Sequence, residues 1–353
     1  MKRLVLVAFV MAASGVGRTT AQEAGWVSLF DGKTLTGGQA AERFESWAIE
    51  DGSLVTRGER SHLFYVGTVA NHELKNFELS AEVMTAPGSN GGIYVHAKLQ
   101  GPGWPEAGYE MQVINSNPPV TGNAYVEHKM TGSIYAIRNT WKAPAKDDEW
   151  FRYRVRVAGK TIQTFINDVL TCEYTETQSP FRPSDKRGRL LGSGTFALQA
   201  HDPGSVVRYR ALKVRLLPDD AASTGTPLAD RELDELITRL SNDNVPLIDL
   251  GLVPPVGPAG EAFASEARRY GVTPGNALPI EAISRYGRSV FVVNDRDQAP
   301  DPAVLQSAKA AGAKIAFSSG GDTKIDEARF KRRLQAIEAA RLVWQDFWVP
   351  GKN

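Results

Sequence analysis

The stretch that decides the fold runs through residues 90–115 and contains two alternating segments: Asn90-Gly-Gly-Ile-Tyr-Val-His96 and, after a loop rich in glycine and proline, Gly108-Tyr-Glu-Met-Gln-Val113. Apolar and polar side chains alternate with period two, as in a strand with one buried and one exposed face. The alternation puts Tyr94 and His96 on the polar face of the first strand, and Glu110 and Gln112 on the polar face of the second. If the strands pair, these four side chains line one polar surface, which is what a sugar site requires.

The bulk composition indicates a soluble globular protein with a neutral partner. The chain has 353 residues, enough for two domains, with 42% hydrophobic and 23% charged residues. Its formal net charge is +1, so no overall field favours nucleic acid or an anionic membrane.

The first residues read as a secretory signal peptide over residues 1–21. Lys2 and Arg3 precede an apolar run at residues 4–13, and small residues at 19–21 form a cleavage site near Ala21. The apolar run is too short to span a bilayer, so we expect no membrane span, although an uncleaved anchor is the alternative. Cys172 is the only cysteine, which excludes an intrachain disulfide. These features predict a bacterial protein that is periplasmic or secreted.

Residues 22–218 have the pattern of an all-β domain. Short alternating segments are separated by Gly, Pro, Asn or Asp and occur at residues 77–83, 92–99, 109–114, 133–137, 151–157, 161–166, 195–199 and 206–217. This density of strands predicts a mainly β, two-sheet sandwich of jelly-roll type.

The character of the chain changes after Pro218. Residues 219–245 combine a polar linker with a segment of helical spacing at 230–240. Residues 246–353 then alternate between apolar strands (246–252, 289–294, 313–318) and helical segments (260–270, 302–311, 325–343). Such alternation predicts a smaller α/β domain with parallel βα units, too short for a full eight-unit barrel.

The sandwich region resembles the 3-keto-disaccharide hydrolase domain family, which has a concanavalin-like fold. The resemblance rests on six pieces in order: Val27-Ser-Leu-Phe-Asp-Gly-Lys-Thr-Leu35, the 90–114 strand pair, Thr131-Gly-Ser-Ile-Tyr135, Glu149-Trp150, Phe165-Ile-Asn-Asp168, and Gly194-Thr-Phe-Ala-Leu-Gln-Ala-His201 leading into Arg208-Tyr-Arg210. The chain departs from the family pattern at Gly91, where a serine is usual, at Asn167-Asp168, where Asn-Gly is usual, and at Ala200-His201-Asp202, where Asp-His-Gly is usual. In the last case the aspartate before the histidine is missing. This affects the basicity expected for His201, because a neighbouring carboxylate raises the basicity of an imidazole.

The C-terminal region is similar, more weakly, to the end of polymerase-and-histidinol-phosphatase-type metallohydrolases, over residues 308–317 and 330–350. Such enzymes hold metal with histidine clusters, yet all five histidines of this chain precede residue 202. Asp249-Leu-Gly-Leu252 stands where a His-x-His would be expected. We therefore expect this domain to be degenerate and catalytically silent.

The resemblance implies cleavage of 3-keto glycosides or 3-keto disaccharides. A carbonyl at C3 acidifies the C2 proton, so a base can remove it, the group at C1 can leave, and water can add to the product. This route requires a general base, an acid for the leaving oxygen and a donor for the enolate.

Glu110, His201 and His96 are the catalytic candidates. Glu110 could instead be a solvated charge at the edge of a sheet, or form an ion pair with an arginine of the 152–156 strand. His201 is expected on the same face of its strand as Gln199, and it could be the base, the acid or a structural residue. His96 is expected on the same strand face as Tyr94. It would then face Glu110, or else be a surface histidine without a role.

Further side chains are candidates for substrate binding. Trp104 lies in a glycine- and proline-rich loop, where an indole can stack on a pyranose face or simply pack the loop. The family often places a lysine at the position of Lys142, which could equally be a solvated surface residue. The full set is Gln112, Tyr94, Asn90, Tyr135, Lys142 and Trp104.

The sequence also leaves other functions open. The sandwich could be a non-catalytic, lectin-like carbohydrate-binding module or a structural module, because fold alone does not fix function. No cofactor is certain, although Glu110 and nearby oxygens could hold a divalent cation such as Ca²⁺. We expect a small carbohydrate as partner and no nucleic acid. The C-terminal domain could serve pairing in a homo-oligomer through its aromatic tail at residues 344–348.

Overall fold

The structure is a computed structural model and describes residues 25–119, 126–249, 266–274, 290–295, 298–319 and 324–347. The expected signal peptide, and most of the expected helix at 260–270, lie outside these residues. The strands of the first part are β1 Trp26–Ser28, β2 Gly38–Ala40, β3 Trp47–Glu50, β4 Ser53–Thr56, β5 Ser61–Tyr65, β6 Phe77–Thr85, β7 Gly91–Ala97, β8 Tyr109–Val113, β9 Phe151–Ala158, β10 Thr161–Ile166, β11 Val169–Thr175, β12 Thr195–Ala200 and β13 Val207–Leu216. Three short 3₁₀ helices accompany them: η1 Phe44–Ser46, η2 Val69–His72 and η3 Ser184–Lys186.

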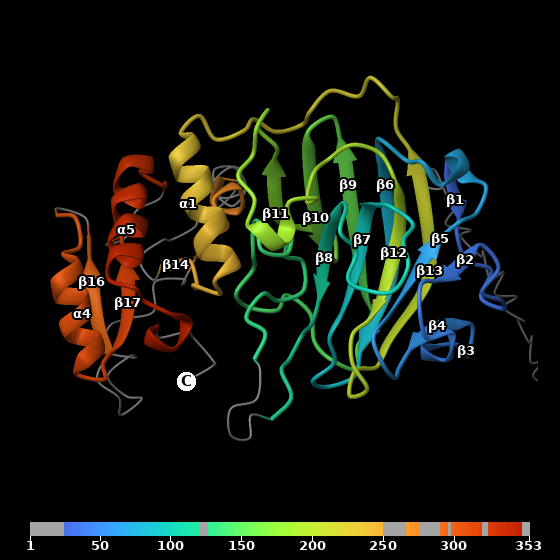
Figure 1. The fold of residues 1–353 in the computed structure, drawn as a ribbon, viewed down its shortest axis with the longest axis horizontal. Coiled ribbons are helices and arrows are strands. Elements are labelled where there is room, and N and C mark those ends of the chain that lie inside the picture. The colour runs from blue at the N-terminus through green and yellow to red at the C-terminus, as the bar shows by residue number, and fades with distance from the viewer. Residues whose placement is uncertain are drawn as a thin grey trace, which may run out of the picture.

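These strands form two facing antiparallel sheets, which confirms the predicted mainly β sandwich (Figure 1). One sheet has eight strands in the order β11-β10-β9-β6-β13-β4-β3, with β1 also paired to β13. The other has five, in the order β2-β5-β12-β7-β8. The predicted pairing of the two segments within residues 90–115 is therefore correct, with Tyr94 opposite Glu110.

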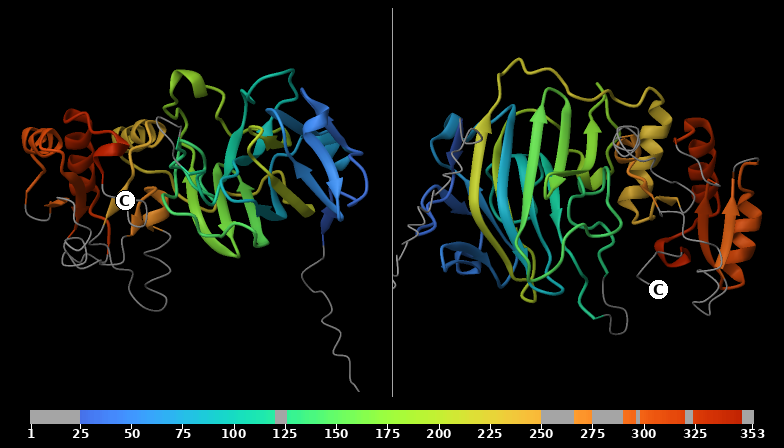
Figure 2. Two further views of the ribbon diagram at one scale, coloured as in Figure 1. Left: turned by 90° about the horizontal axis from the view of Figure 1, so that it is seen from below. Right: turned by 180° about the vertical axis from the view of Figure 1, so that it is seen from behind.

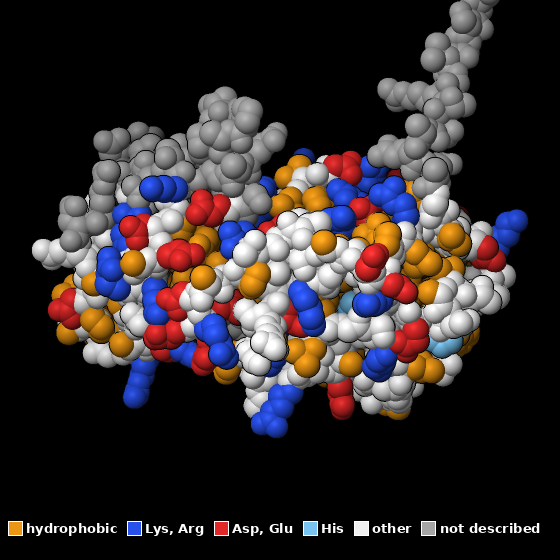
Figure 3. All heavy atoms as spheres, turned by 90° about the horizontal axis from the view of Figure 1, so that it is seen from above, with side chains coloured by type: hydrophobic (Ala, Val, Ile, Leu, Met, Phe, Trp, Pro, Cys, Tyr) orange, Lys and Arg blue, Asp and Glu red, His pale blue; other side chains and the backbone are white. Residues whose placement is uncertain are grey.

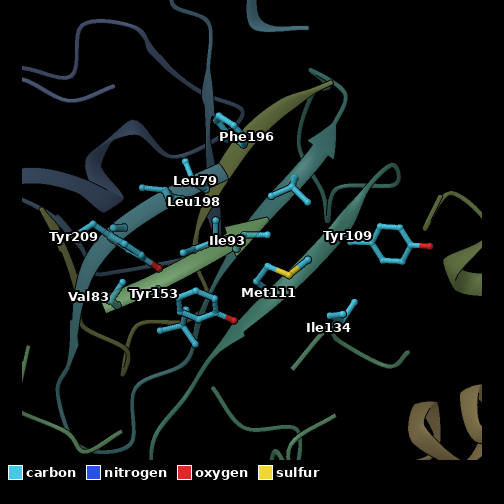
Figure 4. Packing of buried hydrophobic residues seen from close by; sticks show 14 of the residues in the cluster. Leu79, Val83, Ile93, Tyr109, Met111, Ile134, Tyr153, Phe196, Leu198 and Tyr209 are labelled. Carbon is cyan, nitrogen blue, oxygen red and sulfur yellow. The ribbon is translucent and has the colours of Figure 1, made fainter. Parts of the chain in front are cut away.

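The core lies between the two sheets, where the alternating apolar side chains meet (Figure 4). Ile93 and Met111 of the five-stranded sheet and Tyr153 and Tyr209 of the larger one are at most 1% exposed. Since this face of β7 and β8 is committed to the core, their Tyr94, Glu110 and Gln112 side chains must leave on the opposite face.

One predicted strand, at residues 133–137, is wrong. Ala136 has φ 66°, a left-handed conformation that interrupts an extended chain. The Ile137 N–H also donates to the Ile134 carbonyl oxygen at 2.9 Å, closing a turn. The segment is a loop against the edge of β8.

The described residues of the C-terminal part include short parallel strand pairs and helices. Its elements are α1 Arg231–Asn242, β14 Ile248–Asp249, β15 Thr273–Pro274, β16 Val290–Asn294, α4 Pro302–Ala310, β17 Lys314–Ser318, α5 Glu327–Ala339 and the 3₁₀ helix η4 Trp344–Asp346. β14 pairs with β15, and β16 with β17, both in parallel. Because residues 250–265 and 275–289 are outside the description, a complete α/β domain stays a prediction here. We call residues 228–347, as far as they are described, the C-terminal unit.

Helix α5 is shorter than the predicted 325–343 helix, and the reason is local. The Asp326 carboxylate accepts a hydrogen bond from the Arg329 N–H at 2.9 Å and caps the helix start. Arg341, with φ 51°, follows its last turn.

The C-terminal unit lies beside one end of the sandwich (Figures 1 and 2). Lys and Arg side chains are interspersed with Asp and Glu over the face in Figure 3, as expected from a net charge of +1. In the described part of the chain, no helix is both long enough and apolar enough to span a bilayer.

Candidate functional site

The outer face of the five-stranded sheet carries polar side chains in register. One cross-strand row contains His62 on β5, Gln199 on β12, Gly92 on β7 and Gln112 on β8. The next row contains Phe64, Ala197, Tyr94 and Glu110. Gly92 leaves room between them, because a Cβ there would lie 3.1 Å from Glu110 Oε1. The face thus offers a carboxylate and two amides close together.

Loops build walls on this face and enclose a cleft of about 490 Å³. Trp104 and Glu106 come from the β7–β8 loop, Glu127 and Tyr135 from the segment after β8, and Arg189 from the loop before β12. The complete lining is Asn90, Tyr94, Gln100, Pro102, Gly103, Trp104, Pro105, Glu106, Glu110, Gln112, Glu127, Tyr135, Asp185, Lys186, Arg189, Gln199 and His201. Its volume is in the range of small-molecule sites.

Glu110 is tied to the floor of this cleft by both oxygens. Arg189 Nη2 donates to Oε2 at 2.9 Å, and Gln199 Nε2 donates to Oε1 at 3.0 Å. Both members of the ion pair are over nine-tenths buried. The predicted alternative partners in the 152–156 strand belong to the other sheet, so the arginine that pairs with Glu110 is Arg189.

Three residues that line this cleft carry buried polar atoms without partners. Within the part of the chain that the structure describes, Gln112 Oε1, Gln199 Oε1 and Arg189 Nη1 make no hydrogen bond. The first two residues are 1% exposed, and Arg189 is 7% exposed. Buried polar groups without a partner cost free energy, and a ligand that supplies hydroxyl donors and an oxygen acceptor would satisfy them.

Tyr94 lies under the ion pair and stays protonated. Burial, followed by the negative charge of Glu110, raises the pKa of the Tyr94 phenol well above its ordinary value. Its hydroxyl accepts a hydrogen bond from Gln199 Nε2 at 3.3 Å. Asn90 is held similarly, with its Oδ1 accepting from Gln112 Nε2 at 3.1 Å.

His201 lies at the end of β12 with its imidazole supported by Asp202. The Asp202 carboxylate lies 2.7 Å from His201 Nδ1, so that nitrogen donates and the Nε2 atom carries the lone pair. The side chain is 28% exposed and lines the cleft. In the family pattern an aspartate precedes this histidine. Here Asp202, which follows His201, supports the imidazole instead.

Trp104 stands over the cleft between two histidines. Its ring centroid lies 5.3 Å from that of His201 and 5.5 Å from that of His62, and the Arg60 guanidinium lies 5.2 Å from it. The side chain remains 44% exposed. Beneath it, burial lowers the pKa of His62 to about 4, so this imidazole is neutral at pH 7.

The prediction that His96 faces Glu110 is wrong. His96 has φ 55°, and the β12–β7 register shifts between Thr195 and Ala197, which marks a bulge. The bulge turns the imidazole away from the cleft, onto Phe77 at a centroid distance of 5.6 Å. There Nε2 donates to the Lys75 carbonyl oxygen at 2.9 Å and Nδ1 accepts from the Gly192 N–H at 3.2 Å. His96 is a satisfied structural histidine.

Lys142 is also outside the cleft. It is exposed and follows Trp141, which is buried in the core of the C-terminal unit. The structure brings together the other candidates, Glu110, His201, Gln112, Tyr94, Asn90, Tyr135 and Trp104, around one concavity.

Sequence reasoning missed Arg189, Gln199 and Glu127, which line the cleft, and His62, which packs against Trp104. Gln199 carried a usable signal, because it lies two residues before His201 on the same face of one strand. Arg189 and Glu127 lie in irregular loops, where spacing gives no direction.

The described residues contain no cluster of three His, Cys, Asp or Glu side chains that could hold a metal ion. A divalent cation at Glu110 stays a prediction, and the two oxygens of this carboxylate are already occupied by Arg189 and Gln199.

Several solved structures are similar to part of the chain. A "putative glycosyl hydrolase" from Parabacteroides distasonis is 23% identical, with a TM-score of 0.46 over 57% of this chain and 98% of its own. A second one from the same organism is 25% identical, with a TM-score of 0.44 over 54% and 99%. A carbohydrate-binding module from Bacillus subtilis is 11% identical, with a TM-score of 0.37 over 51% and 96%.

No curated protein sequence matches the chain. The sequence profile of one domain family does, and it covers residues 25–215, which is the whole sandwich up to the penultimate residue of β13. The similarity of the C-terminal region to metallohydrolases stays a prediction. The match over the sandwich includes every strand that lines the cleft, and the chain therefore belongs to the 3-keto-alpha-glucoside-1,2-lyase-like domain family.

Proposed function

We propose that this chain cleaves 3-keto glycosides by elimination followed by hydration, with His201 as the base. At the coarse level, family membership makes the sandwich a carbohydrate-active domain. The observation that carries the finer proposal is the convergence of the His201–Asp202 pair and the Glu110–Arg189 pair on one cleft.

The lining of the cleft suits a neutral, hydroxyl-rich ligand. Four carboxylates and two cationic side chains line it, an excess of negative charge that disfavours phosphate or uronate. The free Oε1 atoms of Gln112 and Gln199 can accept hydrogen bonds from sugar hydroxyls. The exposed indole of Trp104 provides an apolar face for the ring.

In the proposed reaction, His201 Nε2 takes the proton from C2. The electron pair of the C2–H bond moves toward the C3 carbonyl and forms an enolate. When the enolate collapses, the C1–O bond breaks, and the imidazolium returns its proton to the leaving oxygen. A double bond between C1 and C2 remains, and addition of water to it completes the net hydrolysis. Asp202 keeps the Nδ1 proton in place and stabilises the transient imidazolium.

Arg189 would supply the donor for the enolate. Its Nη1 has no partner within the described residues and is buried at the cleft, where a donor interacts strongly with developing negative charge. Glu110 orients the guanidinium through Nη2 at 2.9 Å. Glu110 is thus a positioning residue in this proposal rather than the base.

We further propose that the protein acts outside the cytoplasm. The support is the sequence of residues 1–21, with its charged start, apolar run and small-residue cleavage site. Amino-terminal sequencing of the protein recovered from the periplasm or medium tests this, and an intact Met1 would contradict it.

The test of the reaction uses the full-length protein and a 3-keto disaccharide in D₂O. We expect release of free sugar together with deuterium incorporation at C2. His201→Gln should abolish both, because glutamine cannot accept the proton. His72→Gln, which changes a histidine outside the cleft, is the matched control and should keep both. Full turnover by His201→Gln would refute the assignment of the base.

The alternative, a non-catalytic sugar-binding module, has its own support in the amide and indole groups of the cleft. Calorimetric titration with the same disaccharide separates the two. Binding with neither sugar release nor C2 exchange would favour the module and overturn the proposed reaction.

A further inference from the structure

The segment of residues 126–141, which we call the wall segment, joins the cleft to the C-terminal unit. Glu127 and Tyr135 from this segment line the cleft. Three residues further on, its Arg138, Asn139 and Trp141 contact α1 and the residues around Gly271. We infer that the C-terminal unit positions one wall of the sugar cleft, by holding the wall segment against β8.

On its cleft side the wall segment lies along the edge of β8. The Tyr135 N–H donates to the Glu110 carbonyl oxygen at 2.9 Å, and the Gln112 N–H donates to the Ser133 carbonyl oxygen at 3.0 Å. The wall segment therefore adds backbone hydrogen bonds at the very residues whose side chains form the cleft floor. It is not a regular strand, because Ala136 has a left-handed backbone, and on this side it is also held by Ile134 and Ile137, which are buried in the sandwich core.

On its other side the wall segment is anchored by buried polar contacts. Arg138, 1% exposed, donates to the Asp234 carboxylate of α1 and to the Arg269 carbonyl oxygen. Asn139 Nδ2 donates to the Ser241 carbonyl oxygen at 3.1 Å, at the end of the same helix. A buried charged pair is costly to separate, so these contacts fix the segment to α1.

Apolar and aromatic contacts reinforce the anchor. Trp141 is 1% exposed and belongs to the core that α1 and α5 form, and its Nε1 donates to the Gly271 carbonyl oxygen at 3.3 Å. The rings of His128 and Trp344 lie 4.1 Å apart. The wall segment thus reaches both cores: its Ile134 and Ile137 belong to the core of the sandwich, and its Trp141 belongs to the core of the C-terminal unit.

The arrangement explains why Tyr135 stays in reach of a ligand. Its hydroxyl donates to Glu127 Oε2 at 3.1 Å, and its ring lies under Lys129 Nζ at 4.8 Å. Lys129 in turn donates to Asn244, just after α1. Loosening α1 would release the end of these contacts that Lys129 makes with Asn244. A shift of about 1 Å in a binding wall can cost a hundredfold in rate.

The first test needs no substrate and no mutation. Native-state hydrogen exchange, followed by mass spectrometry at increasing denaturant, measures which amides open together. We expect the Thr131, Tyr135 and Arg138 amides to exchange with the same opening free energy as those of α1. The inference is overturned if these amides stay protected after α1 has exchanged, in step with β8.

The second test rests on the proposed function and compares Asp234→Asn with Glu235→Gln. Both change a carboxylate of α1 to an amide, but Asp234 is buried against Arg138 whereas Glu235 is partly exposed and pairs with Arg239. We expect Asp234→Asn to speed exchange across the wall segment and to lower kcat/KM about tenfold to a hundredfold. KM should change more than kcat, because Glu127 and Tyr135 bind rather than react. Glu235→Gln should leave both within about twofold.

The outcomes of the two tests separate the claims. Faster exchange in Asp234→Asn with unchanged kcat/KM would overturn the positioning role while leaving the reaction intact. Absence of turnover in the unmodified protein would refute the proposed function, and hydrogen exchange would still decide the inference. If Asp234→Asn does not fold, exchange in the unmodified protein decides alone.

Discussion

Two buried arginines, one in the sandwich and one in the C-terminal unit, differ in how completely they are bonded. Arg189 lines the 490 Å³ cleft, donates from Nη2 to Glu110, and has no partner for Nη1 within the described residues. Arg333 donates from Nε and Nη2 to both oxygens of Asp295 and from Nη1 to Asp249, at 2.6, 2.8 and 2.8 Å. The cavity beside Arg333 is about 10 Å³, room for roughly one water.

The difference separates a site from a structural anchor. The guanidinium of Arg333 donates from all three of its nitrogens in a closed space and holds the fold together, by joining the ends of β14 and β16 to α5. Arg189, by contrast, lines an open cleft and has one nitrogen without a partner within the described residues. The unpaired donor lowers the stability of the protein, and a bound ligand would recover that loss. His62, with neither ring nitrogen bonded within the described residues, belongs to the same unsaturated region.

The largest expected effect is the response of the two regions to acid. Burial lowers the pKa of His62 and of His96 to about 4, from an ordinary value of 6.5. Between these values the unfolded chain binds protons that the folded sandwich does not, so stability falls as pH drops from 6.5 to 4 and then levels off. Each histidine contributes on the order of 3 kcal/mol over that window.

Urea unfolding at pH 7 and pH 5, read by hydrogen exchange in each region, measures this effect. The C-terminal unit contains no histidine, so its stability should not share this particular decline. His62→Phe should remove about half of the decline in the sandwich. An acid response of the sandwich that is unaltered by His62→Phe would contradict the assignment to this buried imidazole.

The second expected effect concerns the free donor of Arg189. Arg189→Lys keeps a charge for Glu110 but loses the guanidinium fork, so the enolate donor disappears while the ion pair remains. We expect kcat to fall about a hundredfold to a thousandfold, with stability changed by about 1 kcal/mol. Steady-state kinetics on a 3-keto disaccharide, together with urea unfolding, measures both.

Arg187→Lys is the matched control for this prediction, since Arg187 is exposed in the same loop and outside the cleft. Its kcat should stay within about twofold of the unmodified protein. If Arg189→Lys retains comparable turnover, Arg189 has no part in stabilising the transition state.

The regular strands are where sequence and structure agree. Glu110 and Gln112 were predicted on the polar face because β8 alternates without interruption, and packing of Met111 between the sheets enforces this. The same reasoning failed for His96, because a bulge depends on the register with β12, a strand about a hundred residues away in sequence. The alternation of side chains can be predicted from one strand alone, whereas a bulge depends on how two strands pair.

The walls of the cleft were largely beyond prediction. Arg189 and Glu127 come from loops whose direction depends on tertiary contacts, such as those of the wall segment with α1. Trp104 was anticipated from its loop composition, but its place between His62 and His201 follows from the pairing of β5 with β12. The sequence therefore predicts the strand residues at the floor of such a site better than the loop residues of its walls.

A smaller effect, on stability alone, is expected at Arg333. Arg333→Lys cannot reach Asp295 and Asp249 with the same three hydrogen bonds, so the free energy of unfolding of the C-terminal unit should fall by about 2–3 kcal/mol. Turnover of the folded protein should not change. Arg332→Lys, an exposed neighbour on α5, should leave stability within about 0.5 kcal/mol. Loss of kcat at Arg333→Lys without loss of stability would break the contrast with Arg189.

The smallest expected effect is that of Lys142→Ala. The family resemblance placed a lysine near the sugar at this position, whereas the side chain is exposed and does not line the cleft. It follows Trp141, which commits this part of the chain to the C-terminal core and so directs the next residue to solvent. We expect KM and kcat within about twofold of the unmodified protein and stability within about 0.5 kcal/mol. A tenfold rise in KM would instead mean that the wall segment moves on binding and brings Lys142 to the ligand, so that the wall would not be as firmly fixed to α1 as its buried contacts indicate.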